Sequence, residues 1–431
     1  SVRERPSDIQ INYDNSGRLI SSKTVNTKSK VTEENRYRYS GLTEIWELYI
    51  DGKFIKTEDY QTDKNGLCAP GSGRVDCMKD LDHDRPFKFL TYELFFKFNM
   101  VLLKEYLCAK YFNVFIPMKQ ITNTILMIRP VAFRMNEQTK VNNYFQEDLD
   151  LKYSEINAKA QVEFDTFVTK LRGVGVEVIV EDDIMGLDTP DSIFPNNWVS
   201  FHQNGTVALY PMFAENRRRE RREEIITRLE KEGFVVEGFM DYTQAEEQEY
   251  FLEGTGSLLL DRENGKAYCA ISQRAHEELI VEFCEDFEMD PVIFTANQTV
   301  YDQRKPIYHT NVMMALAENF VVICLDTIDD KHEKKQVLKH LKETKKEVIA
   351  ITEAQMHQFA GNMLQVLGAD NQKYMVMSEA ARSSLRSDQV KAIQKHCKIL
   401  SSDLTTIETC GGGSARCMMA EVFLPKALTK A

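Results

Sequence analysis

Cys417 is a candidate nucleophile because it closely follows a run of three glycines, within the segment TCGGGSARC at residues 409–417. Glycines have no Cβ, so another group can approach their backbone closely. Arg416 immediately precedes the cysteine, and its fixed positive charge favours the reactive thiolate. Residues 417–424 have the length and composition of a buried strand, which would place Cys417 at the mouth of a pocket. A free cysteine is also often a small buried hydrophobic residue, and this alternative stays open.

Three other fragments carry polar groups that could act together with this cysteine. Glu253 precedes glycines in FLEGTGS (251–257), His309 lies in PIYHTN (306–311), and Asp191 begins DSIFPNNW (191–198). A thiolate, a histidine and carboxylates are the groups that nucleophilic attack on a polarised carbon requires. Each fragment also has a structural interpretation, because the histidine could be satisfied at a strand end and the glutamate could belong to a turn.

The order and spacing of these fragments resemble those of the guanidino-group modifying hydrolases and amidinotransferases, the pentein superfamily. They are most similar to the citrulline utilisation hydrolase branch, a relative of arginine deiminase, and the resemblance covers about residues 120–425. It implies that Cys417 is the nucleophile, that His309 is the general acid and base, and that Glu253 holds the head group of the substrate. Cys410 is the rival nucleophile, but a neighbouring carboxylate disfavours a thiolate there.

Other residues match the substrate-binding positions of the family, with two departures. Arginine deiminases have aspartates where this sequence has Asn197 and Asn311. An amide can donate a hydrogen bond to a carbonyl oxygen, which suits a neutral ureido group better than a guanidinium. Asp191 could supply the missing acid or could cap a turn.

The resemblance also implies a pocket wall formed by the opening segment RPVAF (129–133), which contributes Arg129 and Phe133. Either Arg129 or Arg416 is expected to pair with the α-carboxylate of an amino-acid substrate. The basic segment 217–222 is interpreted instead as the solvated start of a helix.

Together these residues predict a hydrolase that forms a covalent cysteine adduct and releases ammonia from a guanidino or ureido amino-acid derivative. Citrulline is the favoured substrate and arginine is the next. An amidinotransferase would use the same cysteine but pass the group to an amine, and a non-catalytic pentein binding module is a further alternative. The thiolate and a proton shuttle carry this reaction, so no metal and no organic cofactor is expected.

The composition narrows the class of protein and its partners. The 431-residue chain has a formal net charge of −12, which argues against nucleic-acid binding. No apolar run reaches the roughly 20 residues of a membrane span. The nine cysteines are odd in number and lack a C-x-x-C pair, which favours free thiols in a cytoplasmic protein over a disulfide framework or a zinc site. The expected partner is a small-molecule substrate, and a homodimer is a further possibility.

The chain is predicted to divide near Met118. Residues 1–117 form a small β-rich or irregular segment of unknown role, either accessory or not native to the enzyme, with hairpins near 13–19 and 48–54. From residue 118 to residue 431, a ββαβ pattern recurs five times at intervals of about 50–60 residues. This repetition predicts an α/β fold, and the resemblance implies the five-bladed α/β-propeller of the penteins. Strands are expected at 125–131, 174–180, 197–201, 206–210, 234–238, 256–261, 267–271, 292–294, 312–317, 320–325, 348–351, 374–377, 399–400 and 417–424, and helices at 153–171, 218–232, 274–283, 331–343 and 388–396.

Overall fold

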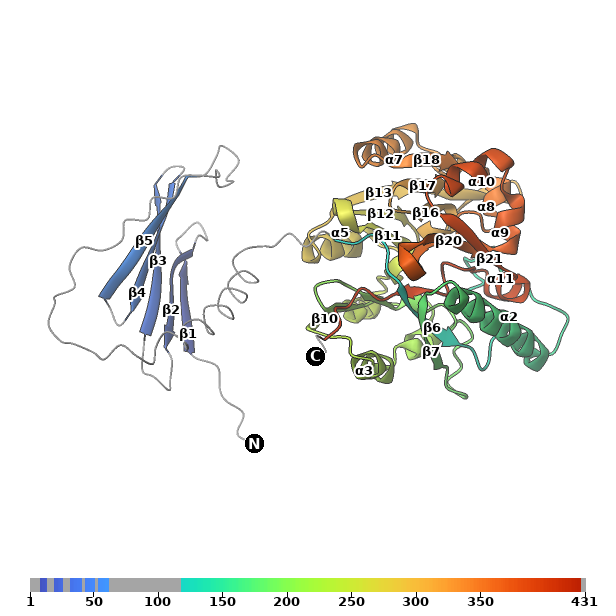
Figure 1. Cartoon of the computed structure of the whole chain (residues 1–431), viewed down its shortest axis with the longest axis horizontal. Helices are drawn as coiled ribbons and strands as arrows, with labels where there is room; N and C mark the ends of the chain where they lie inside the picture. The colour runs from blue at the N-terminus through green and yellow to red at the C-terminus, as the bar shows by residue number, and fades with distance from the viewer. Residues whose placement is uncertain are drawn as a thin grey trace. The chain divides into compact units, whose positions relative to one another are not determined.

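The computed structural model describes residues 118–427 throughout and, before them, the backbone of five strands between residues 8 and 61. The chain divides into two units, residues 1–111 and residues 112–431. Figure 1 shows the strands of the first unit and the larger α/β unit. All of the candidate chemical residues belong to the second unit.

The described strands of the first unit form one antiparallel sheet in chain order. They are β1 (Asp8–Tyr13), β2 (Leu19–Val25), β3 (Thr32–Ser40), β4 (Thr43–Ile50) and β5 (Lys53–Gln61). In the last hairpin, Ile50 lies opposite Lys53, which confirms the hairpin predicted near residues 48–54. β1 and β2 also pair antiparallel, but the connecting residues 14–18 lie outside the described residues. The role of residues 1–117 stays a prediction.

Five three-stranded sheets with one topology form the framework of residues 118–427. In each sheet the middle strand pairs antiparallel with one outer strand, called here the first strand, and parallel with the other outer strand, the third. A parallel pair requires a crossover connection, and a helical segment supplies it between the second and third strands. In one of these sheets the last strand of the unit pairs with its first, so the two ends of the unit meet.

The five sheets, each with its first strand named first, and their crossover helices have the following bounds. The sheets are β22 (Ala420–Glu421), β6 (Thr124–Arg129) and β7 (Glu177–Asp182); β8 (Val199–Phe201), β9 (Thr206–Leu209) and β10 (Gly238–Asp241); β11 (Leu258–Asp261), β12 (Lys266–Ile271) and β13 (Asp290–Thr295); β16 (Met314–Leu316), β17 (Phe320–Ile323) and β18 (Glu347–Ala350); and β19 (Leu364–Leu367), β20 (Lys373–Ser378) and β21 (Lys398–Ser402). The crossover helices are α2 (Tyr153–Gly173), α3 (Glu223–Lys231), α5 (Glu277–Asp286), α7 (Lys331–Glu343), and the pair α9 (Glu379–Ser384) and α10 (Ser387–Gln394). Shorter elements are η1 (Pro195–Asn197), α4 (Gly254–Ser257), the hairpin β14 (Asn297–Val300) and β15 (Gln303–Pro306), α6 (Thr310–Met313), α8 (Glu353–Met356) and α11 (Thr405–Gly411).

The helices form where the sequence provides an apolar face and a start signal. Buried residues recur at every third or fourth position of α2, including Ile156, Ala160 and Phe164, and this face packs against β6 and β7. α7 begins after Asp330, whose carboxylate accepts hydrogen bonds from the N–H groups of His332 at 2.7 Å and Glu333 at 2.9 Å. Figure 1 shows the long helices on the outside of this unit and the sheets inside.

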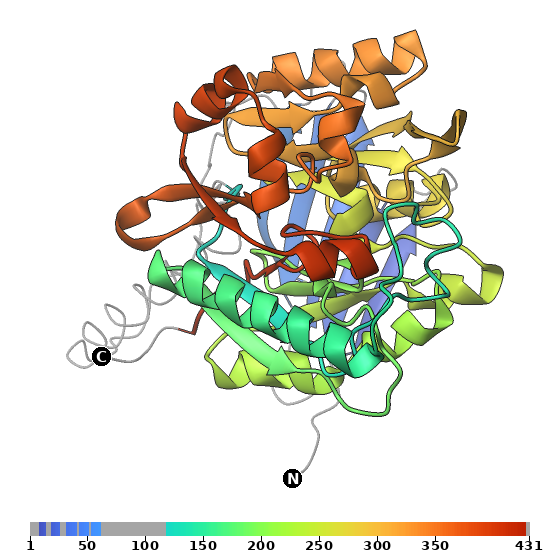
Figure 2. The ribbon, with the colours of Figure 1, turned by 90° about the vertical axis from the view of Figure 1, so that its right-hand side faces the viewer.

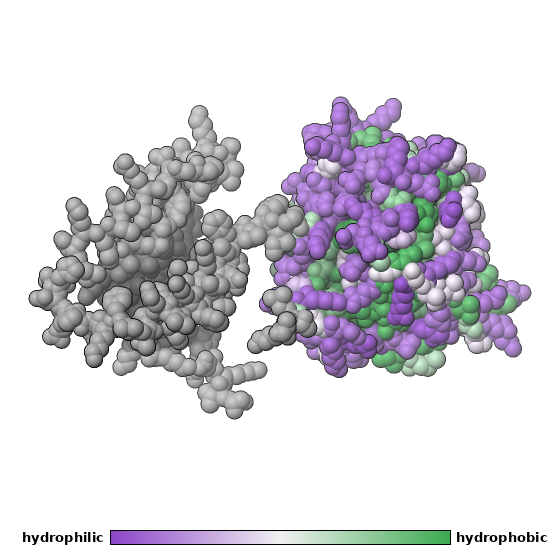
Figure 3. Space-filling view, in the orientation of Figure 1, coloured by the Kyte–Doolittle hydropathy of each residue, from purple (hydrophilic) through white to green (hydrophobic). Residues whose placement is uncertain are grey.

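The helix α11 and the distribution of apolar side chains show how the outside of this unit is packed. α11 lies beside α2 (Figure 2), so the glycine run starts where a helix is already fixed against the core. The face in Figure 3 is mostly hydrophilic over the described residues, while the apolar side chains gather in the clusters between the helices and sheets. None of the described helices is long and apolar enough to cross a membrane.

The expected α/β fold is confirmed, but several elements differ from the prediction. The strand expected at 417–424 is wrong, because only Ala420–Glu421 pairs with a neighbouring strand. Residues 414–419 instead form tight turns, in which the N–H of Cys417 donates to the carbonyl of Ser414. The strand expected at 234–238 begins only at Gly238. The five sheets within residues 118–427 are small, and none of them closes on itself.

Candidate active site

Segments that precede the first strands of the five sheets come together in one buried cluster. Asn197 ends η1 before β8, Glu253 precedes α4 and β11, and His309 precedes α6 and β16. Asn362 lies before β19, and Cys417 lies in the turn before β22. Contacts between α4 and η1 and between α4 and α6 join three of these segments. The repeated topology therefore assembles residues that are far apart in the sequence.

The sulfur of Cys417 lies against two asparagine side chains. Nδ2 of Asn362 is 3.2 Å from Sγ, and Nδ2 of Asn311 is 3.5 Å from it. The cysteine itself is buried. Hydrogen-bond donors stabilise a sulfur anion more than a neutral thiol. Oδ1 of Asn311 also lies 3.7 Å from Sγ, so side-chain amides, rather than a cationic side chain, lie against the predicted nucleophile.

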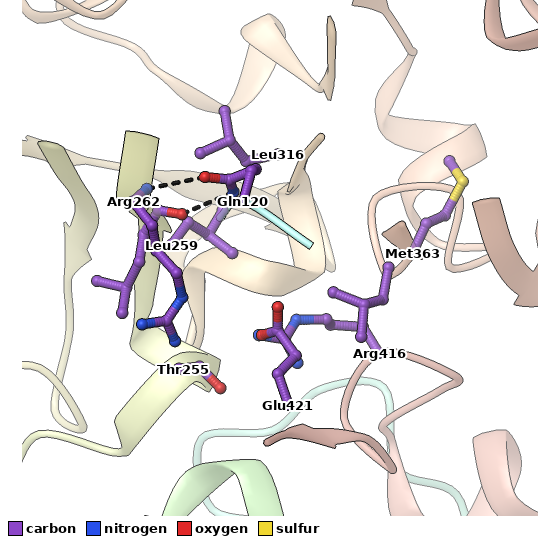
Figure 4. Close-up of a pocket in the computed structure, with 10 residues that line it drawn as sticks. Gln120, Thr255, Leu259, Arg262, Leu316, Met363, Arg416 and Glu421 are labelled. Atoms are coloured by element: carbon purple, nitrogen blue, oxygen red, sulfur yellow. Dashed lines mark hydrogen bonds and ion pairs between the residues drawn. The ribbon is translucent and has the colours of Figure 1, made fainter. Parts of the chain in front are cut away.

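Arg416 is not brought to this cluster, although it is next to Cys417 in sequence. Its guanidinium donates to Oε2 of Glu421 at 2.8 Å and to the carbonyl of Met419 at 2.9 Å. These side chains line a cavity of about 20 Å³ together with Arg262, and Figure 4 shows Arg416 and Glu421 on one side of it. Because Glu421 neutralises its charge, Arg416 is not the free cation that the sequence suggested.

Cys410 differs from Cys417 in its surroundings. It lies within α11 and is fully buried in an apolar cluster that includes residues of α2. Burial, followed by the charge of Asp148, raises the pKa of the Cys410 thiol to about 11. The structure therefore gives this rival cysteine the environment of a core residue.

His309 and Glu253 form a buried pair. Nε2 of His309 lies 2.7 Å from Oε2 of Glu253, and Oε1 of Glu253 accepts a hydrogen bond from the N–H of Phe213 at 3.1 Å. Burial lowers the pKa of His309 to about 4, against the opposing effect of Glu253. Burial alone would raise the pKa of Glu253, but the charge of Arg274 and the hydrogen bond from His309 hold it well below its usual value. At neutral pH, an ionised Glu253 therefore accepts the Nε2–H of a neutral His309, and Nδ1 is left as a base.

Gly256 leaves the space that this pair needs. A Cβ at this position would lie 2.4 Å from Nδ2 of Asn197 and 2.8 Å from Nδ1 of His309. Both distances are shorter than side-chain contacts allow, so only glycine fits between these two groups.

Two buried arginines flank the carboxylate of Glu253. Arg217 forms two hydrogen bonds with Glu220, each 2.9 Å long, and its NH1 lies 3.8 Å from Oε2 of Glu253. NH1 of Arg274 lies 3.4 Å from the same oxygen, and its NH2 donates to the carbonyl of Thr139 at 2.9 Å. The interpretation of residues 217–222 as a solvated helix start is wrong for Arg217, which is 1% exposed.

Arg217 also determines the orientation of the side-chain amide of Asn197. NH1 of Arg217 lies 2.8 Å from Oδ1 of Asn197. A guanidinium can only donate, so the atom that faces it is the amide oxygen. Nδ2 of Asn197 therefore points away from Arg217 and donates one hydrogen to Oδ1 of Asn196 at 3.1 Å.

Asp191 is held by the segment that follows β6. Its Oδ2 accepts hydrogen bonds from Nδ2 of Asn136 at 2.8 Å and from the hydroxyl of Thr139 at 3.0 Å. Its Oδ1 is buried and has no hydrogen-bond partner among the described residues. Burial raises the pKa of Asp191, against the charges of Arg217 and Arg274. The carboxylate thus presents one unused acceptor in the same charged cluster.

The two remaining predicted residues have different surroundings. Phe133 is 1% exposed and lies close to Gly411, so it forms part of the apolar wall beside the glycine run. Arg129 lies at the end of β6 and donates from Nε and NH2 to Asp165 of α2, at 2.8 and 2.9 Å. The side chain of Arg129 is about one-third exposed, and these contacts direct it to α2 rather than to the cluster.

The functional candidates that the sequence did not reveal are Asn362, Arg217 and Arg274. Both arginines follow the second strand of their sheet, but at different distances from it, so the sequence offered only the general signal of an arginine after a strand. Asn362 has a weaker signal, a Gly-Asn pair before a strand. Within residues 118–427, no three His, Cys, Asp or Glu side chains are grouped as metal ligands.

Comparisons with known proteins agree with this architecture. ArgZ, an arginine dihydrolase from the ornithine-ammonia cycle in cyanobacteria, matches 71% of this chain and 41% of its own chain, with 17% identity and a TM-score of 0.55. The N-terminal domain of ArgZ has also been crystallised as a cysteine-to-serine mutant bound to substrate. The match covers 99% of that domain and 70% of this chain, with 16% identity and a TM-score of 0.52. Unliganded AgrE matches 70% of this chain and 40% of its own, with 17% identity and a TM-score of 0.54. The chain thus spans about two-fifths of the ArgZ and AgrE chains, and these likenesses show a shared α/β fold.

The sequence also matches a known enzyme family. The model described as N,N dimethylarginine dimethylhydrolase, eukaryotic, matches residues 129–424, and the chain belongs to this family. It is therefore a member of the pentein superfamily of guanidino-group modifying enzymes, with the fold of a hydrolase that acts on carbon–nitrogen bonds. No curated protein sequence matches the chain.

Proposed function

We propose that the chain is a cysteine-dependent hydrolase of a guanidino or ureido amino-acid derivative, with citrulline preferred over arginine. The observation that carries this proposal is the single buried cluster formed by Cys417, its asparagine donors and the His309–Glu253 pair. The relatives support it, because one solved structure of the ArgZ N-terminal domain holds a covalently bonded reaction intermediate and another, a cysteine-to-serine mutant, holds substrate.

In the first step, the Cys417 thiol gives its proton to the free nitrogen of His309, and the sulfur attacks the central carbon of the head group. His309 then passes this proton to the departing nitrogen. The carbon–nitrogen bond breaks, ammonia leaves, and the carbon stays bonded to Sγ. Glu253 was expected to hold the head group of the substrate; in this proposal it instead keeps the ring oriented through its 2.7 Å contact with Nε2 and stabilises the imidazolium that forms transiently.

In the second step, a water molecule attacks the carbon of the adduct and gives a proton to His309. The carbon–sulfur bond breaks, and the departing thiolate takes the proton back. Arginine would yield the ureido product, whereas citrulline would yield a carbamic acid. The groups of this chain that act in both steps are the same sulfur and the same imidazole.

The preference for a ureido head group depends on what the cluster offers a ligand. Asn197 presents an N–H donor, because its oxygen is occupied by Arg217. Asp191 presents an unused carboxylate oxygen, which accepts N–H groups. A ureido group has both a carbonyl oxygen and N–H groups, whereas a guanidinium has only donors. The roles of Asn197, Asn311 and Asp191 as substrate ligands form part of this proposal.

We also propose that the five sheets are blades of one α/β-propeller. The pairing of β22 with β6 joins the two ends of the unit, and first strands of different sheets contact one another, as β11 does β16 and β16 does β19. The central position of these strands would place the preceding segments around one axis. A crystal structure of residues 118–431 would test this arrangement directly.

The test of function is product release from a panel of arginine, citrulline, agmatine and methylated arginines. We expect ammonia from citrulline with a higher kcat/KM than from arginine. Cys417→Ser should abolish turnover, while the matched variant Cys410→Ser should retain most of it. Mass spectrometry of His309→Asn should show a slowly formed adduct that persists on Cys417.

Each outcome decides a different part of the proposal. A higher kcat/KM for arginine would contradict the ureido preference but leave the hydrolase intact. Transfer of the group to an added amine in preference to water would identify an amidinotransferase. Binding without turnover of any member of the panel would identify a non-catalytic module.

A further inference from the structure

Asn362 occupies a position that connects three segments around Cys417. Its Oδ1 accepts hydrogen bonds from the N–H of Arg416 at 3.0 Å and from the N–H of Cys417 at 3.4 Å. Its Nδ2 donates to the carbonyl of Asn311 at 3.0 Å and lies 3.2 Å from Sγ of Cys417. The side chain is fully buried, so water does not compete for these bonds.

The direction of this amide follows from its neighbours. The two backbone N–H groups can only donate, so the atom that faces them is Oδ1. The carbonyl of Asn311 can only accept, so the atom that faces it is Nδ2. Both constraints agree, and they leave one hydrogen of Nδ2 directed at the sulfur of Cys417.

The backbone before Asn362 is built for this close approach. A Cβ on Gly361 would lie 2.1 Å from the carbonyl oxygen of Val312 and 2.9 Å from the carbonyl carbon of Met313. Both residues belong to α6, which also carries Asn311. Only glycine therefore allows the segment to reach α6 and to hold the amide at the sulfur.

We propose that Asn362 stabilises the thiolate of Cys417 through its Nδ2–H. The proposal rests on the proposed function in assigning Cys417 as the nucleophile, and it adds a catalytic residue that touches the reacting atom. The donor stabilises the anionic sulfur before attack and again when the carbon–sulfur bond breaks. No cationic side chain performs this role among the described residues in contact with Sγ.

The test compares variants in the rate of Cys417 alkylation by iodoacetamide as a function of pH, measured by mass spectrometry of the full chain without substrate. Asn362→Asp keeps an oxygen for the two backbone N–H groups but replaces the donor at the sulfur by a carboxylate oxygen. Its alkylation midpoint should move to higher pH by about 1 unit or more, because a like charge disfavours the thiolate. Asn204→Asp is the matched control, since its Oδ1 accepts the N–H of Thr206 at an exposed turn and the variant adds the same charge there.

Asn362→Ser gives a second measurement that adds no charge and replaces the amide Nδ2 at the sulfur by a shorter hydroxyl side chain, and its midpoint should also rise. If the enzyme turns over a substrate, the acidic limb of kcat/KM should move with the alkylation midpoint. Folded Asn362→Asp and Asn362→Ser with the wild-type midpoint would overturn the proposal. Since alkylation needs no substrate, a failure of the whole substrate panel leaves this test valid and is distinguishable from it.

Discussion

At the level of single residues, the directions of buried amides determine what the cluster can bind and which sulfur it can activate. Cys417, His309 and Glu253 were predicted from their order in the sequence; the structure pairs His309 with Glu253 and places Asn311, two residues after His309, against the sulfur of Cys417. Asn362 and Arg217 could not be predicted in the same way. A single asparagine or arginine has no periodicity, and its role depends on neighbours that are distant in the sequence.

Asn197→Asp tests the amide that faces the ligand. The variant keeps the oxygen that accepts from Arg217 at 2.8 Å and replaces the donor by a second acceptor. Losing a buried donor to a ligand carbonyl typically costs about 1–3 kcal/mol, so kcat/KM for citrulline should fall roughly tenfold to a hundredfold. The ratio of citrulline to arginine turnover should fall as well. An unchanged ratio would mean that this amide does not touch the head group.

The buried histidine predicts a pH dependence of stability. The pKa of His309 is lowered by burial from 6.5 to about 4, so the unfolded chain binds this proton first as the pH falls. His309 therefore has no effect well above pH 6.5 and destabilises the folded state progressively between pH 6.5 and pH 4, by at most about 3 kcal/mol.

Urea unfolding at pH 7, 6 and 5 measures this effect. The wild type should lose more free energy of unfolding over this range than His309→Gln, whose side chain does not titrate. His332→Gln, at an exposed position of α7, is the control and should follow the wild type. A parallel loss in the wild type and in His309→Gln would contradict the lowered pKa.

At the level of elements, long periodic segments were predictable and short ones were not. The helix expected at 331–343 is α7 (Lys331–Glu343), because its apolar spacing and its Asp330 cap are both local signals. The expected strands at 256–261 and 312–317 begin instead with the single helical turns α4 and α6. One turn is too short for a period to be visible in the sequence. These turns nevertheless place Glu253 and His309, so the site depends on the elements that were hardest to predict.

The glycine run provides a prediction at this level. Gly412 has φ +60°, and a Cβ on it would lie 2.6 Å from both Asn143 and Gln146. Gly233, after α3, has φ +88° but nothing within 4 Å of the position of a Cβ. Gly233→Ala should therefore cost only the strain of a left-handed backbone, about 1–2 kcal/mol.

Gly412→Ala should cost clearly more, because the same strain is joined by a collision with the segment 143–146. The measurement is the free energy of unfolding in urea for both variants. Equal losses would mean that this segment moves aside without cost, and that the glycine is required for its backbone angle alone.

At the level of the whole molecule, the repeat explains why a site built from five segments that are separated in the sequence is compact. The same end of each sheet receives the segment before its first strand, so chemistry at equivalent positions converges. The number of repeats was predictable from the spacing of strands and helices. Their contacts with one another were not, because the first strands are short and carry no pattern that identifies a neighbour.

The division of the chain gives the last prediction. Residues 112–431 form one unit by themselves, and every residue of the cluster lies within it. Its apolar clusters are also built from residues within 118–427, so this part buries a core of its own. Expressed alone, residues 118–431 should fold and should retain the kcat/KM of the full chain on its best substrate. The control is Cys417→Ser in the shortened chain, which should be inactive. A large loss of kcat/KM in a folded, shortened protein would show that the first unit contributes to the reaction.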